Sequence, residues 1–139
     1  MSKAINLNDV NDIKKGMTLY HVYGVAAQAE LYDINYVTRF QVVRPPYDDP
    51  IGSTPTMWID GIANCLQDHN HKDNEYERKS LGDCGILDLN QRKIYNLNRL
   101  FWTYADALEF IEELNSKEFS DPADQAFYDD VARFNSYLD

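Results

Sequence analysis

The chain has 139 residues, which is enough for one ordinary domain with its own core and too few for two. Apolar residues make up 44% of the chain and aromatic residues 13%, a composition that excludes an intrinsically disordered protein. The net charge is -10, and no apolar run reaches the roughly 18 residues of a membrane-spanning helix, so we expect a cytoplasmic protein that does not bind membranes.

The acidic residues are concentrated near the C-terminus. Residues 1–50 carry 5 basic and 6 acidic groups (net -1), and residues 51–100 carry 6 and 7 (net -1). Residues 101–139 carry 2 basic groups against 10 acidic groups (net -8). Such a field repels nucleic acid and attracts basic protein surfaces, so the sequence predicts a protein partner and no direct nucleic-acid binding.

The first half of the chain predicts an antiparallel sheet. A short helix or turn is expected over residues 6–16, followed by a strand over residues 17–25. Two-residue alternation over residues 31–43 indicates a long strand that bends, as in a curled sheet or small barrel. Prolines and glycine predict a loop over residues 44–55, and residues 56–62 read as a third strand.

The middle of the chain is less regular. Residues 67–79 are polar and highly charged, which predicts a mobile surface segment. Residues 80–89 and 91–95 are expected to form two short strands, or a strand and a turn.

Two helices are predicted at the C-terminal end. Thr103 is the expected N-cap of the first helix, with Asp106 at its third position and Asn115 as its end. Asp121 is the expected N-cap of the second helix. The predicted buried faces are Tyr104, Ala107, Leu108, Ile111 and Leu114 in the first helix, and Phe127, Val131, Phe134 and Leu138 in the second.

These elements predict an α+β fold in a single domain over residues 1–139. We expect a curled antiparallel sheet or small open barrel of four to five strands, with two C-terminal α-helices packed against it. The mainly β body covers residues 1–99 and the acidic helical end covers residues 100–139.

A zinc site is one candidate for chemistry. Cys65, His69, His71 and Cys84 follow the order C-x3-H-x-H-x12-C and would supply the four nitrogen or sulfur ligands of tetrahedral zinc. The spacing departs from the usual C-x2-C and H-x3-H pairs. In the alternative interpretation, both cysteines are small buried apolar residues and the histidines lie in a solvated loop, so that no cofactor is bound.

Enzymatic alternatives centre on residues 65–84. A cysteine hydrolase would pair Cys65 or Cys84 with His69 or His71, although no histidine follows Cys84 as a downstream base. A metal-dependent nuclease would use Asp60 with the Glu77-Arg78-Lys79 run. A basic patch with tyrosines for stacking is a further alternative, and its members would be Arg39, Arg44, Arg78, Lys79, Arg92, Lys93 and Arg99.

The acidic end is the remaining signal. Its carboxylates recur at helical spacings of three and four residues, which places several on common faces. They either keep the surface solvated or stand in for duplex phosphates in the basic groove of a DNA-handling protein. The candidate partner-binding residues are Asp106, Glu109, Glu112, Glu113, Asp124, Asp129 and Asp130.

The run SLGDCGIL at residues 80–87, with LFWTYADALEFIEEL at residues 100–114, resembles small accessory proteins of tailed bacteriophages. In these proteins a curled sheet is often followed by a helix that starts with an aromatic residue, Thr and, three residues on, Ala. The resemblance implies an accessory gene product, a class that includes inhibitors of host defence and host enzymes.

We therefore expect a non-catalytic acidic binding protein, a phage-type inhibitor acting on a basic or nucleic-acid-binding host protein through a carboxylate-rich helical surface. DNA mimicry is its narrower form. The alternatives are a small metal-dependent or thiol enzyme at residues 65–84, and a virion or replication accessory protein whose surface is a subunit interface. A homo-oligomer is compatible with each of them.

Overall fold

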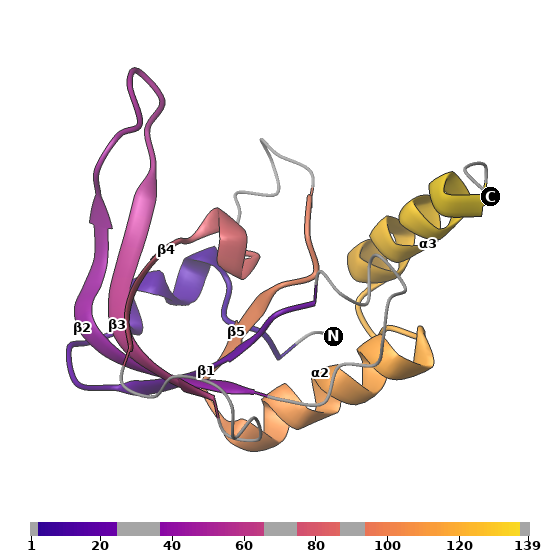
Figure 1. The fold of residues 1–139 in the computed structure, drawn as a ribbon, viewed down its shortest axis with the longest axis horizontal. Helices are drawn as coiled ribbons and strands as arrows, with labels where there is room; N and C mark the ends of the chain where they lie inside the picture. The colour runs from indigo at the N-terminus through magenta and orange to yellow at the C-terminus, as the bar shows by residue number, and fades with distance from the viewer. Residues whose placement is uncertain (1–2, 25–36, 66–74, 87–93, 137–139) are drawn as a thin grey trace.

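The computed structural model describes residues 3–24, 37–65, 75–86 and 94–136. Five antiparallel strands form one sheet in the order β4-β3-β2-β1-β5, curled into a half barrel with two C-terminal helices packed against it (Figure 1). The predicted α+β fold is confirmed. Its elements are η1 (Leu7–Asp12), β1 (Thr18–Val22), β2 (Thr38–Asp48), β3 (Met57–Cys65), β4 (Glu75–Ser80), η2 (Gly82–Cys84), β5 (Arg99–Phe101), α2 (Tyr104–Ser116) and α3 (Pro122–Ser136).

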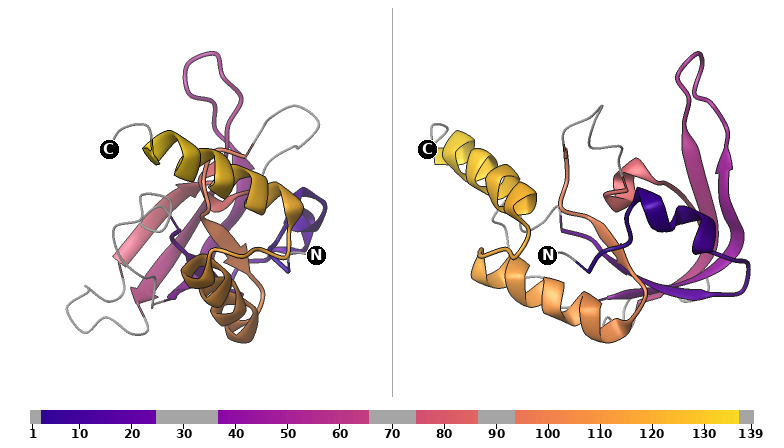
Figure 2. Two further views of the ribbon diagram at one scale, coloured as in Figure 1. Left: turned by 90° about the vertical axis from the view of Figure 1, so that its right-hand side faces the viewer. Right: turned by 180° about the vertical axis from the view of Figure 1, so that it is seen from behind.

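The sheet packs a core on each of its faces, because successive side chains of a strand point to opposite sides. The two 3-10 helices lie inside the curl and α2 lies outside it (Figure 2). Leu19, Phe40 and Ile59 point inward and belong to one buried cluster, together with side chains of η1 and η2. Phe101 and Val22 belong to the outer cluster, with the apolar face of α2.

Strand β2 is longer than the sequence predicts on its C-terminal side. It continues to Asp48, so the loop expected over residues 44–55 is wrong for its first five residues. The pairing of β2 with β3 shifts register between Val42 and Arg44 and again between Arg44 and Tyr47. The second irregularity contains the two prolines, at a place where regular ladder hydrogen bonds are not needed. Residues 31–36 of the predicted strand lie outside the described residues.

The charged segment predicted over residues 67–79 is wrong for its last five residues, which belong to edge strand β4. Residues 67–74 lie outside the described part of the chain, as do residues 87–93. The two strands expected over residues 80–95 are also not found where the chain is described: η2 follows β4 directly, and residues 94–98 run without regular structure into β5.

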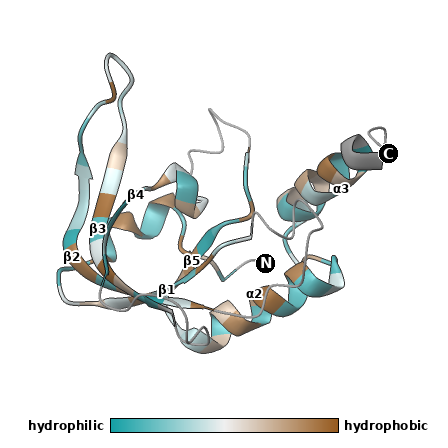
Figure 3. Ribbon diagram, in the orientation of Figure 1, coloured by the Kyte–Doolittle hydropathy of each residue, from teal (hydrophilic) through white to brown (hydrophobic). Residues whose placement is uncertain are grey.

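Helix α2 begins as predicted, with Thr103 Oγ1 accepting a hydrogen bond of 3.1 Å from the Asp106 amide. It ends at Lys117, which has a left-handed φ of 65°, and not at Asn115. Its buried face includes Phe110, whereas Leu108 is 38% exposed. The colours of Figure 3 alternate along α2 between hydrophobic and hydrophilic residues, as expected for a helix with one buried side.

In α3 the predicted cap is also found, with Asp121 Oδ1 accepting 2.9 Å from the Ala123 amide. Among the described side chains of this helix, Asp124 and Tyr128 are buried, and the predicted residues Phe127 and Val131 are half-buried. The side chains of Phe134 and Leu138, the other two predicted residues, lie outside the described part. Among the described residues, no helix combines the length and apolar character that crossing a bilayer requires.

Candidate binding surface on the C-terminal helices

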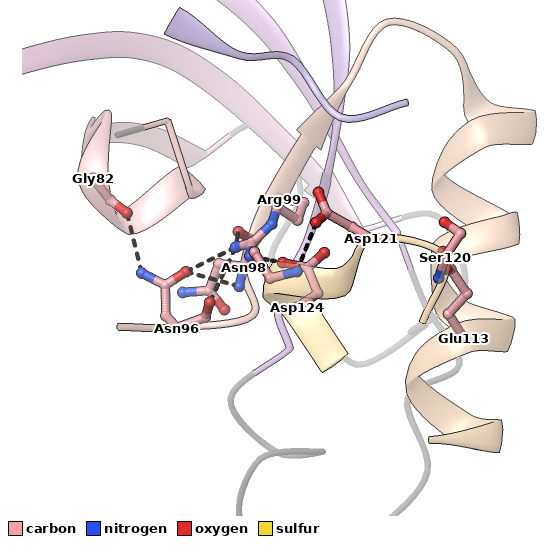
Figure 4. A network of polar contacts seen from close by, with 9 residues as sticks. Gly82, Asn96, Asn98, Arg99, Glu113, Ser120, Asp121 and Asp124 are labelled. Carbon is pink, nitrogen blue, oxygen red and sulfur yellow. Dashed lines mark hydrogen bonds and ion pairs between the residues drawn. The ribbon is translucent and has the colours of Figure 1, made fainter. Parts of the chain in front are cut away.

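A buried ion pair attaches α3 to the sheet. Arg99 Nη2 lies 2.5 Å from Asp124 Oδ1, and both side chains are almost inaccessible to solvent (Figure 4). Arg99 Nη1 also donates to the carbonyl oxygens of Asn96, at 3.1 Å, and Asn98, at 2.6 Å. Burial raises the pKa of Asp124, and the Arg99 charge opposes that rise. The prediction that Asp124 belongs to an exposed partner-binding surface is therefore wrong, since it joins the helical end to β5.

Three further predicted binding residues, all on α2, have contacts within the molecule. Lys3 Nζ lies 3.0 Å from Glu109 Oε2 and 3.6 Å from Asp106 Oδ1. Glu113 Oε1 accepts a hydrogen bond of 2.5 Å from the Ser120 amide, in the turn between α2 and α3 (Figure 4). Part of the predicted carboxylate row is therefore neutralised by Lys3 or committed to the connection between the helices.

The other predicted carboxylates are available at the surface. Glu112, Asp129 and Asp130 are exposed. Asp129 accepts 3.1 Å from Gln125 Nε2, and Asp130 lies 3.8 Å from Arg133 across two largely exposed side chains. Contacts between exposed side chains of this kind contribute little to stability. These three acids, with Glu109, form what we call the α2–α3 acidic surface.

The Asp60 carboxylate lies on the outer face of the sheet and is already hydrogen-bonded. It accepts from Tyr47 Oη at 2.7 Å and from Tyr76 Oη at 2.5 Å. Burial alone would raise the pKa of Asp60, but these hydrogen bonds, with Arg44 and Arg78 nearby, hold it below its usual range. The hydrogen bond that Tyr76 donates to Asp60 also raises the pKa of the Tyr76 hydroxyl.

The nuclease hypothesis needs Asp60 and Glu77 to face one metal ion. Asp60 pairs across β3 and β4 with Arg78, so the neighbouring Glu77 points to the opposite face of the sheet. There the Glu77 carboxylate lies 2.7 Å from Lys79 Nζ. The two acids are on different sides of the sheet, and the predicted nuclease site is wrong.

The two cysteines are separated along β3. Cys65 ends that strand, whereas Cys84 follows Ser80, which pairs with Trp58 near the other end. The side chain of Cys65, like His69 and His71, lies outside the described part of the chain, so the zinc site stays a prediction. Cys84 is fully buried, and burial raises its thiol pKa to about 12, the opposite of what a nucleophilic thiolate needs.

A comparison with known protein families identifies a match over most of the chain. Residues 7–114 match the family model described as Phage g100-like protein. The chain belongs to the Phage g100-like protein family. The predicted phage affiliation is thereby confirmed, over the sheet and most of α2. No curated protein and no solved structure matches the chain.

Two members of the predicted basic patch of this Phage g100-like protein, Arg44 and Arg78, lie together over the Tyr47 ring on the outer face of the sheet. Arg39 is exposed, Arg99 is buried against Asp124, Lys79 faces the inside of the curl, and residues 92–93 lie outside the described part.

The sequence interpretation placed Arg44 and Arg78 in a patch with stacking tyrosines, but it did not identify Tyr47 and Trp58 as their aromatic partners on the outer face of the sheet. The Arg44 guanidinium lies 3.5 Å from the centre of the Tyr47 ring, and that of Arg78 lies 3.9 Å from Trp58. Arg78 also pairs with Asp49 at 2.6 Å. The alternation of arginines and aromatic residues in the sequence could have indicated this aromatic–arginine cluster. The sequence interpretation instead assigned Tyr47 to a loop, whereas it lies in β2. The charges of this cluster are matched internally, which indicates a structural role.

Proposed function

We propose that this Phage g100-like protein is a non-catalytic binding protein that engages a basic surface of a host protein through the α2–α3 acidic surface. One observation supports it above the others. After the buried and structurally bonded acids are set aside, the exposed carboxylates Glu112, Asp129 and Asp130 still lie in the segment that carries a net charge of -8. The contacts of Asp129 with Gln125 and of Asp130 with Arg133 lie between exposed side chains and contribute little to stability, so a partner can compete for these carboxylates.

The structure narrows the set of residues in this proposal. Asp124 leaves the predicted set, and Glu113 is committed to the turn before α3. Lys3 interrupts the row at Asp106 and Glu109. Duplex DNA carries one charge per about 1.7 Å of axis, a density that an interrupted row does not reach. We therefore favour contact with a basic patch over continuous phosphate mimicry, which would require Lys3 to move away.

The test compares equal numbers of charge reversals at two places. Glu112→Lys, Asp129→Lys and Asp130→Lys are combined in the full chain, and the control combines reversals to Lys of the exposed acids Asp12, Asp48 and Glu75 on the sheet body. The unmodified chain serves as bait in a host lysate to identify the partner. Calorimetry then measures the affinity of that partner for the unmodified chain and for each of the two variants. Each unscreened charge contact contributes to a salt-dependent affinity.

The proposal predicts that affinity falls at least about tenfold between 50 mM and 300 mM salt and that the helical reversal weakens it by a similar factor. The control reversal should leave affinity within about twofold of the unmodified chain. Equal weakening by both variants, or salt-independent binding, would show that the α2–α3 acidic surface is not the binding site.

A further inference from the structure

The half barrel is open, because edge strands β4 and β5 do not pair with each other. A cavity of about 460 Å³ lies at this opening, lined by β1, β4 and the segment that leads into β5. Small-molecule sites in proteins usually enclose about 300–1,000 Å³ and often lie in the mouths of barrels. The cavity is distinct from the α2–α3 acidic surface, which lies on the helices outside the curl.

His21 is the most unusual residue in the lining. It is only 6% exposed, and neither ring nitrogen hydrogen-bonds to any residue that the structure describes. Burial, with the nearby Lys79 charge, lowers its pKa to about 3, so the ring is neutral at physiological pH. A neutral imidazole offers one donor and one acceptor. A ligand in the cavity could therefore use both ring nitrogens without displacing a protein hydrogen bond.

The remaining lining consists of two tyrosines, two asparagines and three charged residues, Arg78, Lys79 and Asp83, of which Arg78 is paired with Asp49. Tyr23 and Tyr95 are 47% and 49% exposed, so both present ring surface at the cavity. Tyr95 is held by donating its hydroxyl to Asp83 Oδ1 at 3.0 Å. Asn98 Oδ1 accepts 2.9 Å from the Gly24 amide, which leaves its own amide group as a donor. Lys79 is paired with Glu77, so it is not a free charge for an anion.

We propose that this cavity binds an uncharged, planar heteroaromatic ring of the nucleobase class. His21 would supply a donor and an acceptor to the ring edge, Asn98 a further donor, and Tyr95 or Tyr23 a stacking surface. Such a ring could come from a free nucleoside or from a base in a single strand. The net charge of -10 disfavours the strand, because it repels a phosphate backbone.

The experiment titrates the full chain with adenosine, guanosine, cytidine and uridine, then with the monophosphates and short single strands of whichever nucleoside binds. Binding is measured by calorimetry and by the NMR shift of the His21 imidazole protons. The proposal predicts saturable binding of at least one nucleoside, a shift of the His21 signals, and equal or weaker binding of the phosphorylated forms. Much tighter binding of the phosphates or strands would overturn it, because phosphate contacts would then dominate.

Variants separate this site from a nonspecific one. His21→Phe keeps ring volume and removes both polar atoms, and Tyr95→Ala and Tyr23→Ala each remove a stacking surface. Nucleoside affinity should fall at least about tenfold in His21→Phe and in one tyrosine variant. Tyr76→Ala, on the outer face of the sheet, is the matched control and should bind normally.

Folding of each variant is checked by circular dichroism. The proposal fails if no nucleoside binds at millimolar concentration, or if folded cavity variants bind as well as the control; either result leaves the proposed function of the α2–α3 acidic surface standing.

Discussion

The sheet body and the helical end use their carboxylates differently. On the sheet, Asp60 lies among two tyrosine hydroxyls and two arginines, and its charge is matched where it stands. The helical end carries ten acids against two bases, and the only acid buried in its described part, Asp124, is matched by Arg99 from the sheet. Residue type is the same in both regions. The partner and the burial decide whether an acid stabilises the fold or remains available at the surface.

The strongest test of this contrast is Asp124→Ala. The substitution leaves the Arg99 guanidinium buried without its carboxylate, and breaking a buried pair in this way costs about 3–5 kcal/mol. Urea unfolding followed by circular dichroism would measure the loss. The double variant Arg99→Met with Asp124→Leu should lose less than the single variant, because no charge is left buried. A loss below about 1 kcal/mol in Asp124→Ala would show that the pair does not join the regions.

Acid should destabilise the sheet body through His21. The folded pKa is about 3 and the ordinary value is 6.5, so between these values the unfolded state binds the proton that the folded state does not. Stability therefore rises with pH through this window and falls on acidification. Between pH 7.5 and pH 4.5 the loss from His21 alone is about 2–3 kcal/mol.

Urea unfolding at these two pH values tests the effect, with His21→Phe as the comparison. The variant lacks the titrating group, so the stability that it loses between the two pH values should be smaller than the loss of the unmodified chain. The difference between the two losses should be about 2–3 kcal/mol. Parallel losses in the two proteins would mean that His21 is not buried in its neutral form.

The contrast also explains what sequence could predict. Local signals were sufficient for α2, because Thr103 caps its own helix and apolar residues recur at its turn spacing. The curled sheet followed from the two-residue alternation. Sequence failed where a distant residue decided the outcome: Asp124 has the appearance of a surface acid until Arg99, 25 positions earlier, is placed beside it. Strand β4 was missed because its charged residues are held by pairing with β3, which local polarity does not reveal.

The nuclease prediction failed for the same reason. Asp60 and Glu77 were assigned to one metal, yet the pleat sends them to opposite faces. Spacing in sequence fixes distance only within one helix or strand. Across strands, register decides which side chains meet, and register depends on the whole sheet.

A smaller effect is expected at the boundary between the regions. Thr103→Ala removes the side-chain oxygen that accepts from the Asp106 amide at the start of α2. Loss of such a cap costs about 1 kcal/mol. Thr103→Ser, which retains the hydroxyl, is the control and should recover most of the loss in thermal unfolding. If the serine and alanine variants are equally destabilised, the loss of stability comes from removing the threonine methyl group and not from removing the cap.

The smallest effect belongs to the exposed acids, and it completes the contrast with Asp124. Glu112→Gln removes a charge that no described residue pairs with, and it relieves repulsion from the other carboxylates of α2. Stability should change by less than about 0.5 kcal/mol, with a slight gain at low salt. Urea unfolding of Glu112→Gln beside Asp124→Ala would place two acids of the same helical end at opposite extremes. A substantial loss in Glu112→Gln would mean that this side chain has a structural partner, and it would remove Glu112 from the α2–α3 acidic surface.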